Sequence, residues 1–319
     1  MTAPIAISLN FDSLNEAYGF PSGFRDPSFF EFFDRFAELA ARYEFPISIY
    51  IIARDLEHPE HFARVRDWAT AGFEIGNHSW SHPFNLGGMP KDRMREEICR
   101  AHDAIASCTR TEPTGFIAPA WSTSREVVST LIDLGYQYDT SVFPSVYLYP
   151  FVLKAAVNHL GNSKKLWSLF QRGDWTVPFS KPVRPYVVDR QFREVRNPAE
   201  TTERLVILPL PTRSHLAPCI WHTVGFVFGR DYLARQLHRL LDTHTGFYYL
   251  IHPADFIGQE DVRAWGRQHL QRMQFSLRQK MESLTDVFEL LRCCGRPVRL
   301  MADLARYHMD QLGETTAPR

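Results

Sequence analysis

The chain has 319 residues, a length that α/β barrels reach as a single domain. Its 36 basic and 36 acidic residues balance, and the pI is about 7.2. Nucleic acids and anionic membranes usually recruit proteins with a basic surface, so we expect neither as a partner. No apolar run approaches the roughly 20 residues of a transmembrane helix, so we expect no transmembrane segment.

Strand-like and helix-like patterns alternate along the chain. Alternating or continuous apolar runs predict strands, and apolar residues at helical spacing predict helices. Strands are expected at 6–12, 46–53, 73–75, 115–120, 136–142, 204–211, 247–252 and 297–301. Helices are expected at 29–43, 59–71, 91–107, 126–134, 232–241, 272–293 and 302–312. This alternation indicates an α/β fold in which parallel strands close into a barrel with helices outside.

The alternation breaks at about 144–203, where the chain becomes rich in aromatic residues. A break of this length is too long for an ordinary connection within one catalytic domain, 1–319, so we expect an inserted helical and aromatic segment. One alternative is a helical hairpin that only packs against the barrel. The other is a segment that covers the substrate or contacts a membrane surface.

Three predicted strands end in side chains that carry chemistry. The first ends in Asp12, the third is followed by His78 and His82, and the strand at 247–252 ends in His252. Catalytic groups of α/β barrels lie at the carboxyl ends of the strands, so we expect these four side chains to meet there.

The two histidines His78 and His82 are four residues apart. If the chain turns into helix at this point, both imidazoles lie on one face and converge on one divalent ion. The alternative is that they are hydrogen-bonded packing groups, because the chain contains 13 histidines.

These motifs resemble those of the NodB-like polysaccharide deacetylases, metal-dependent esterases that remove N-acetyl groups from amino sugars. The matching segments are Asn10-Phe11-Asp12-Ser13, His78-Ser79-Trp80-Ser81-His82 and Leu250-Ile251-His252. They occur in family order between Ile5 and about Asp255. The resemblance implies a distorted (β/α) barrel of about seven parallel strands.

The resemblance also assigns roles to single residues. It implies Asp12 as catalytic base, His78 and His82 as ligands of a divalent metal, with zinc expected, and His252 as proton donor to the leaving amine. We further expect substrate contacts from a group of residues near these motifs: Trp80, Trp121, Pro119 and Arg213.

The chain departs from the family at two positions in this site. Ser13 stands where the family has its acidic metal ligand, and Ile117 stands where the family has an arginine that holds the base. Two imidazoles and a hydroxyl leave a dication without an anionic ligand. Either Asp12 ligates the ion, or Glu16 replaces the missing acid, or metal binding is weak or absent.

The missing arginine has a second consequence. A cation beside a carboxylate lowers its pKa and fixes its orientation, so Asp12 loses both when Ile117 replaces arginine. Arg213 and Arg125 are the two residues that we consider as substitutes. Backbone N–H groups near Trp121 are our candidates for stabilising an oxyanion.

We therefore expect a metal-dependent hydrolase that removes an acetyl or formyl group from an amino sugar or glycan precursor. Two alternatives remain: a metal-independent hydrolase of a small amide, and a carbohydrate-binding protein without catalysis. Five cysteines without disulfide-type spacing, and a chain start without a signal peptide, indicate a cytoplasmic protein.

Overall fold

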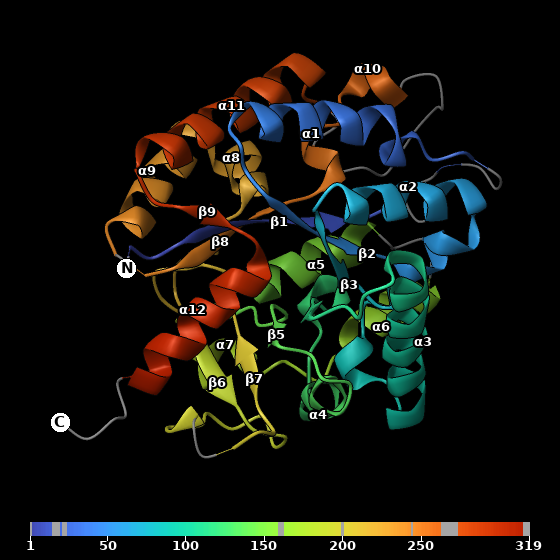
Figure 1. Cartoon of the computed structure of the whole chain (residues 1–319), viewed down its shortest axis with the longest axis vertical. Coiled ribbons are helices and arrows are strands. Elements are labelled where there is room, and N and C mark those ends of the chain that lie inside the picture. Colours follow the sequence, from blue (N-terminus) through green and yellow to red (C-terminus); the bar gives the residue numbers. More distant parts are fainter. Residues whose placement is uncertain are drawn as a thin grey trace.

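Nine strands form one curled sheet that makes an incomplete barrel (Figure 1). The computed structural model describes residues 2–14, 20, 24–158, 163–198, 201–243, 245–262 and 274–314. The strands are β1 (Ile5–Phe11), β2 (Ile47–Ile51), β3 (Glu74–Asn77), β4 (Gly115–Phe116), β5 (Tyr138–Asp139), β6 (Tyr186–Val188), β7 (Leu205–Ile207), β8 (Phe247–Ile251) and β9 (Val298–Arg299).

The strand order is β6-β7-β5-β4-β3-β2-β1-β8, and β9 also pairs with β1. Every pairing is parallel except that of β6 with β7. The predicted distorted barrel is therefore confirmed, with seven parallel strands along the main path. The antiparallel strand β6 was not expected, and in the described residues β6 and β8 form the two edges of the sheet.

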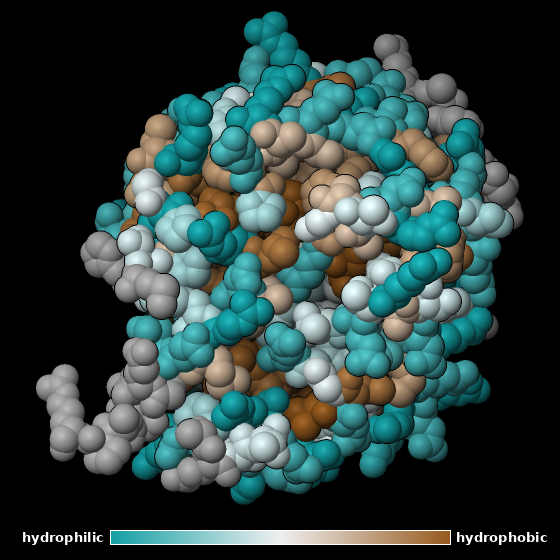
Figure 2. Space-filling view, in the orientation of Figure 1, coloured by the Kyte–Doolittle hydropathy of each residue, from teal (hydrophilic) through white to brown (hydrophobic). Residues whose placement is uncertain are grey.

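Helices pack around the outside of the sheet (Figure 1). The longer ones are α1 (Glu31–Arg42), α2 (Pro59–Thr70), α3 (Lys91–Thr109), α4 (Arg125–Asp133), α9 (Arg230–Leu241), α11 (Leu277–Cys293) and α12 (Met301–Glu314). Figure 2 shows hydrophilic residues projecting from this face, with apolar residues recessed between them. Among the described residues, no helix has the length and apolar character needed to cross a bilayer.

In its described residues, 144–158, 163–198 and 201–203, the expected insertion contains three helices and one strand. The helices are α5 (Leu148–Asn158), α6 (Ser163–Phe170) and α7 (Val177–Ser180), and the strand is β6, which joins the sheet. The short helices α8 (His222–Phe228) and α10 (Gln259–Val262) lie elsewhere in the fold. The expected strand at 115–120 is shortened to β4, because Pro119 has no N–H for the ladder and begins a 3-10 turn.

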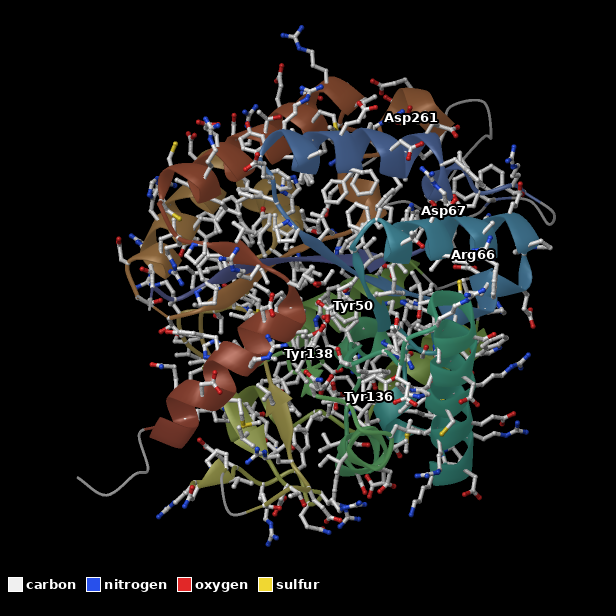
Figure 3. The ribbon with its side chains drawn as sticks, viewed as in Figure 1. Tyr50, Arg66, Asp67, Tyr136, Tyr138 and Asp261 are labelled. Carbon is white, nitrogen blue, oxygen red and sulfur yellow. The ribbon has the colours of Figure 1, made fainter. Side chains whose placement is uncertain are left out.

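Large tyrosines, among them Tyr50 and Tyr138, fill the interior of the sheet (Figure 3). Tyr50 lies against Gly76, and Tyr138 lies against Gly115. The Tyr50 hydroxyl donates to that of Tyr138 (2.8 Å), which donates to Glu74 Oε1 (2.6 Å). Burial raises the pKa of all three groups, so the phenols stay neutral. Glu74 also accepts from the N–H of Ala302, in the first turn of α12. This network therefore joins three strands and the last helix.

Replacing Gly115 by alanine is expected to destabilise the fold by about 1–3 kcal/mol, the usual cost of overpacking a core. An added Cβ would lie 2.1 Å from the Tyr138 hydroxyl and would displace the ring from Glu74. Chemical denaturation measures the loss. Gly135→Ala is the control, because a Cβ there meets nothing within 4 Å and costs only left-handed backbone strain. Equal losses in both variants would contradict the packing argument.

Candidate active site

Asp12, His78 and His82 form one cluster at the carboxyl ends of β1 and β3. Asp12 Oδ1 lies 3.3 Å from His78 Nε2 and 3.4 Å from His82 Nε2. The ligand atoms of all three residues lie within 4.8 Å of one another. In the described part of the chain, no other group of three histidine, cysteine or acidic residues is arranged in this way. The donors thus converge on one point.

The hydrogen bonds of His78 show which of its ring nitrogens is available to bind a metal ion. Its Nδ1 lies 2.8 Å from the carbonyl oxygen of Ile117, which only accepts, so Nδ1 carries the proton. Burial lowers the pKa of His78 and favours a neutral ring whose Nε2 can bind a metal, although the hydrogen bond with Asp12 opposes this shift. Nε2 lies 3.3 Å from the carboxylate oxygen of Asp12. The position between these two atoms suits a cation, either the proton of the hydrogen bond or a divalent metal.

The charge state of Asp12 agrees with this interpretation. Burial alone would raise its pKa, but the hydrogen bonds with His78 and His82, together with the charges of His82 and His252, hold the pKa of Asp12 well below its usual range. Asp12 therefore remains ionised near neutral pH. It supplies the anionic oxygen that Ser13 lacks.

The prediction that a helix aligns the two histidines is wrong. His78–His82 form an irregular loop in which Ser79 (φ 65°) and His82 (φ 60°) adopt left-handed backbone conformations. Two hydrogen bonds hold this loop: Asn77 Oδ1 accepts from Ser79 N, and Ser79 Oγ accepts from His82 N. The two rings converge, with centroids 4.8 Å apart, because the loop folds back on itself.

A neighbouring 3-10 turn, η3 (Ala53–Glu57), supports this loop. The N–H groups of Ala53 and Arg54 donate to the carbonyls of Ser79 and Trp80, each at 3.0 Å. Because β2 lies between β1 and β3, the turn that follows β2 is positioned between Asp12 and the histidines. This support was not foreseen, since 3-10 turns leave little periodic signal in a sequence.

Asp55, in the same turn, is a site residue that the sequence analysis missed. Burial raises the pKa of Asp55 to about 6, against the lowering influence of a hydrogen bond with Ser13 and of the charges of Arg54 and His82. A second carboxyl therefore lies beside the position where the family's acidic ligand is replaced. The other proposed substitute, Glu16, lies outside the described residues.

His252 lies near the cluster, at the end of β8. Its charge acts on the Asp12 carboxyl, and its backbone N–H donates to Asp255 Oδ2 (2.9 Å). The same carboxylate oxygen lies 3.9 Å from His252 Nδ1. Asp255 is fully buried and therefore fixes the position from which His252 faces the site.

An aromatic wall adjoins His252. Trp121 stacks on Trp221 with centroids 4.7 Å apart and an interplanar angle of 2°. Trp221 in turn meets His252 edge-on at 6.5 Å. The sequence analysis identified Trp121 but missed Trp221, which follows an irregular stretch after β7 and has no periodic pattern around it.

The remaining expected contact residues have different surroundings. Trp80 is half-buried and packs under Arg100, whose guanidinium lies 3.7 Å from the ring centroid. Pro119 is buried, and Arg213 is exposed on the segment that follows β7. Arg125 pairs with Glu126 on the surface and so does not supply the missing positive charge.

The backbone near Trp121 does not form the expected oxyanion site. The N–H of Trp121 donates to Ala118 (2.9 Å), and that of Ser122 donates to Pro119 (3.0 Å). Both donors are used inside a tight turn in which Ala120 and Trp121 have positive φ angles of 49° and 56°. Turn geometry of this kind could not be foreseen from the sequence, since neither residue is a glycine or asparagine.

Comparison with known proteins shows which proteins the chain resembles. Residues 3–138 match the family model described as polysaccharide deacetylase. Over 157 residues the chain is 25% identical to the peptidoglycan deacetylase of Helicobacter pylori, a match that covers 49% of this chain and 50% of that protein. The polysaccharide deacetylase model therefore matches the N-terminal part of the chain, which is less than half of its length. The chain spans about half the length of that curated relative.

Solved structures show the same fold at low identity. A Mycobacterium smegmatis protein described as a candidate polysaccharide deacetylase has a TM-score of 0.60 and 15% identity, covering 100% of this chain and 93% of that one. The Puue allantoinase has a TM-score of 0.58 and 14% identity at the same coverage. A CE4 family pseudoenzyme from Bacillus anthracis has a TM-score of 0.50 and 13% identity, covering 95% and 66%.

Proposed function

We propose that this protein is a metal-dependent hydrolase that removes an N-acyl group, acetyl or formyl, from an amino sugar or glycan precursor. One observation carries the proposal: Nε2 of His78 and Nε2 of His82 lie 3.3 Å and 3.4 Å from the same oxygen of Asp12, so three metal-ligating atoms converge. Two imidazoles and one carboxylate are the ligand set of many catalytic zinc sites, so zinc is the expected ion.

His78, His82 and Asp12 would hold the ion. When bound, a divalent ion polarises an amide carbonyl and lowers the pKa of water. Asp12 holds its negative charge beside both imidazoles and compensates for the hydroxyl of Ser13. His252, fixed by Asp255, donates a proton to the leaving amine. Trp121 and Trp221 exclude water from one side of the reacting group.

The match to the family model and the residues of the site support the proposed substrate class. The Helicobacter pylori relative is a peptidoglycan deacetylase, and this likeness supports an N-acylated amino sugar as substrate. Trp80, Trp121, Pro119 and Arg213 remain the proposed contact residues. Aromatic rings such as Trp121 suit the apolar faces of sugar rings. The cytoplasmic location remains a prediction.

His252→Ala is expected to lower the deacetylation rate about 10²–10⁴-fold, the usual contribution of a positioned acid or base. The zinc content should not change, because His252 is not among the ligands. The assay measures acetate and free amine released from N-acetylglucosamine oligomers and from isolated peptidoglycan. His308→Ala is the control, since its ring binds the Gly246 carbonyl instead. Full activity of metal-stripped wild-type protein would refute the proposed function.

A carbohydrate-binding protein without catalysis is the alternative that a specific observation favours. Ser13 and Ile117 replace two groups on which the family's chemistry depends, and the site still keeps its aromatic wall. This alternative expects glycan binding with no amine product at any zinc concentration. The metal-independent amide hydrolase expects turnover that a chelator does not affect.

A further inference from the structure

The helices of the 144–203 segment expose an unusual amount of apolar surface. Among the described residues, six of the nine large apolar side chains that are strongly exposed lie between positions 147 and 179. We refer to these six as the α5–α7 surface. They are Tyr147 (37% exposed), Leu153 (62%), Val157 (56%), Trp167 (66%), Phe170 (48%) and Phe179 (64%). Apolar side chains gathered in this way mark an interaction site.

Helix α5 shows that this exposure is not an ordinary surface pattern. Its inner face buries Leu148, Val152 and Ala156, spaced four residues apart. Its outer face, which should be polar in a surface helix, carries Leu153 and Val157. Because apolar residues occupy both faces, the outer one lacks the cover that such a helix normally has.

Aromatic contacts join the three helices. Tyr149 of α5 stacks with Trp175 and with Phe179 of α7, each at 6.1 Å. The indole N–H of Trp175 donates to the carbonyl of Phe170, the last residue of α6. The exposed side chains therefore belong to neighbouring parts of one packed unit.

The charge of this segment differs from that of the whole chain. Residues 144–181 contain a single acid, Asp174, which is buried in an ion pair with Arg172 (2.6 Å). The other charged residues of the segment are all basic: Lys154, Lys164, Lys165 and Lys181. The overall balance of 36 basic and 36 acidic residues hides this asymmetry. Exposed aromatic and aliphatic residues together with lysines are typical of helices that lie in an anionic membrane interface.

The α5–α7 surface is also connected to the active site. Phe151, on the inner side of α5, meets Trp121 (5.4 Å) and Trp221 (6.1 Å), the two rings of the aromatic wall. In addition, Arg172 donates to the carbonyl of Ala120 (2.8 Å), next to Trp121. A partner that binds the outer face of α5 would therefore lie close to the active site.

We propose that the α5–α7 surface binds the interface of a bilayer that contains anionic phospholipid. The apolar side chains enter the boundary between headgroups and acyl chains, and the net positive charge of residues 144–181 attracts the lipid phosphates. A second copy of the chain fits less well, because two segments of net positive charge repel each other. Bound in this way, the protein presents its site to glycans held at a membrane, whatever bond it cleaves there.

Vesicle co-sedimentation tests the proposal without depending on catalysis. The probes are vesicles of phosphatidylcholine alone and vesicles in which about one third is phosphatidylglycerol. Wild-type protein is expected to bind the anionic vesicles, and the bound fraction is expected to fall with added salt. The double variant Leu153→Glu/Val157→Glu should bind at least about tenfold more weakly, because two apolar contacts are lost and two negative charges are added.

Val227→Glu is the matched control, since Val227 of α8 is exposed to the same 56% as Val157 but lies outside the surface. It should bind vesicles as wild-type does. All variants should melt at the wild-type temperature, because each changed side chain is exposed. Failure of wild-type to bind anionic vesicles would overturn the proposal, as would equal binding by the double variant. So would a lipid-free dimer that the α5 substitutions dissociate.

Discussion

Replacing His78 or His82 by alanine is expected to remove both stoichiometric zinc and amide hydrolysis. Each change leaves two of three converging donors, so zinc affinity should fall by at least about a hundredfold, beyond what loss of an outer hydrogen bond costs. Metal content by mass spectrometry after dialysis, together with amine release, measures both effects. The two variants should fail alike, because Nε2 of each ring lies close to the same Asp12 oxygen.

His78 and His82 differ in how much they contribute to the stability of the fold. Comparing the two variants therefore separates an effect on zinc binding from an effect on folding. His78 is 2% exposed and donates to Ile117, so its loss also leaves a buried carbonyl unpaired at a cost of about 1–3 kcal/mol. His82 is 17% exposed, so its loss should change stability little. His238→Ala, at an exposed histidine of α9, is the control. If both His78→Ala and His82→Ala retained zinc, the site would not be a metal centre.

The sequence was sufficient for the fold because its strands are long or strongly patterned where they matter. β1 and β2 are mostly apolar and buried throughout, and a helix such as α1 carries a clear amphipathic face. β4 and β5 have only two residues each, and the expected strands there were too long. Short strands depend on their neighbours for hydrogen bonds, and a local pattern contains no information about those neighbours.

The site was predictable in its residue types but not in its geometry. Asp12, His78, His82 and His252 end strands, and parallel strands bring such ends together. The left-handed loop that aligns the histidines depends on Asn77 and Ser79 side chains, which have no periodic signal. Asp55 lies in a short 3-10 turn, and Trp221 ends an irregular stretch just before α8. Their place in the site follows from the strand order alone, and a sequence pattern does not give that order.

Ile117 illustrates how a departure from a family pattern is misjudged from sequence alone. Its side chain cannot replace an arginine, and the sequence therefore indicates a loss. In the structure its backbone carbonyl fixes the tautomer of His78 and so directs the lone pair of Nε2 to the cluster. Any residue at this position supplies that carbonyl. The consequence is that His78 keeps its orientation toward Asp12 although the arginine side chain is absent.

Ser13→Asp is expected to make the protein bind zinc at least about tenfold more tightly than wild-type, because it adds an anionic oxygen beside Asp12. Without metal the same change should destabilise the fold by about 1–3 kcal/mol. Ser13 is 2% exposed and lies beside Asp55, so an added negative charge there has no cation to balance it. Zinc supplies that cation. The variant should therefore melt below wild-type in chelator and gain more in melting temperature when zinc is added.

Ser13→Asn separates charge from shape in this experiment. Asparagine has the size of aspartate but adds no charge. The difference in melting temperature between Ser13→Asn and wild-type should therefore be nearly the same with chelator and with zinc. A tenfold gain in affinity corresponds to about 1.4 kcal/mol of added stability at saturating zinc. If Ser13→Asp bound zinc no more tightly than Ser13→Asn, the ion would not lie within reach of position 13. The carboxyl of Asp12 would then be its sole anionic ligand, and the hydroxyl of Ser13 would serve Asp55 instead.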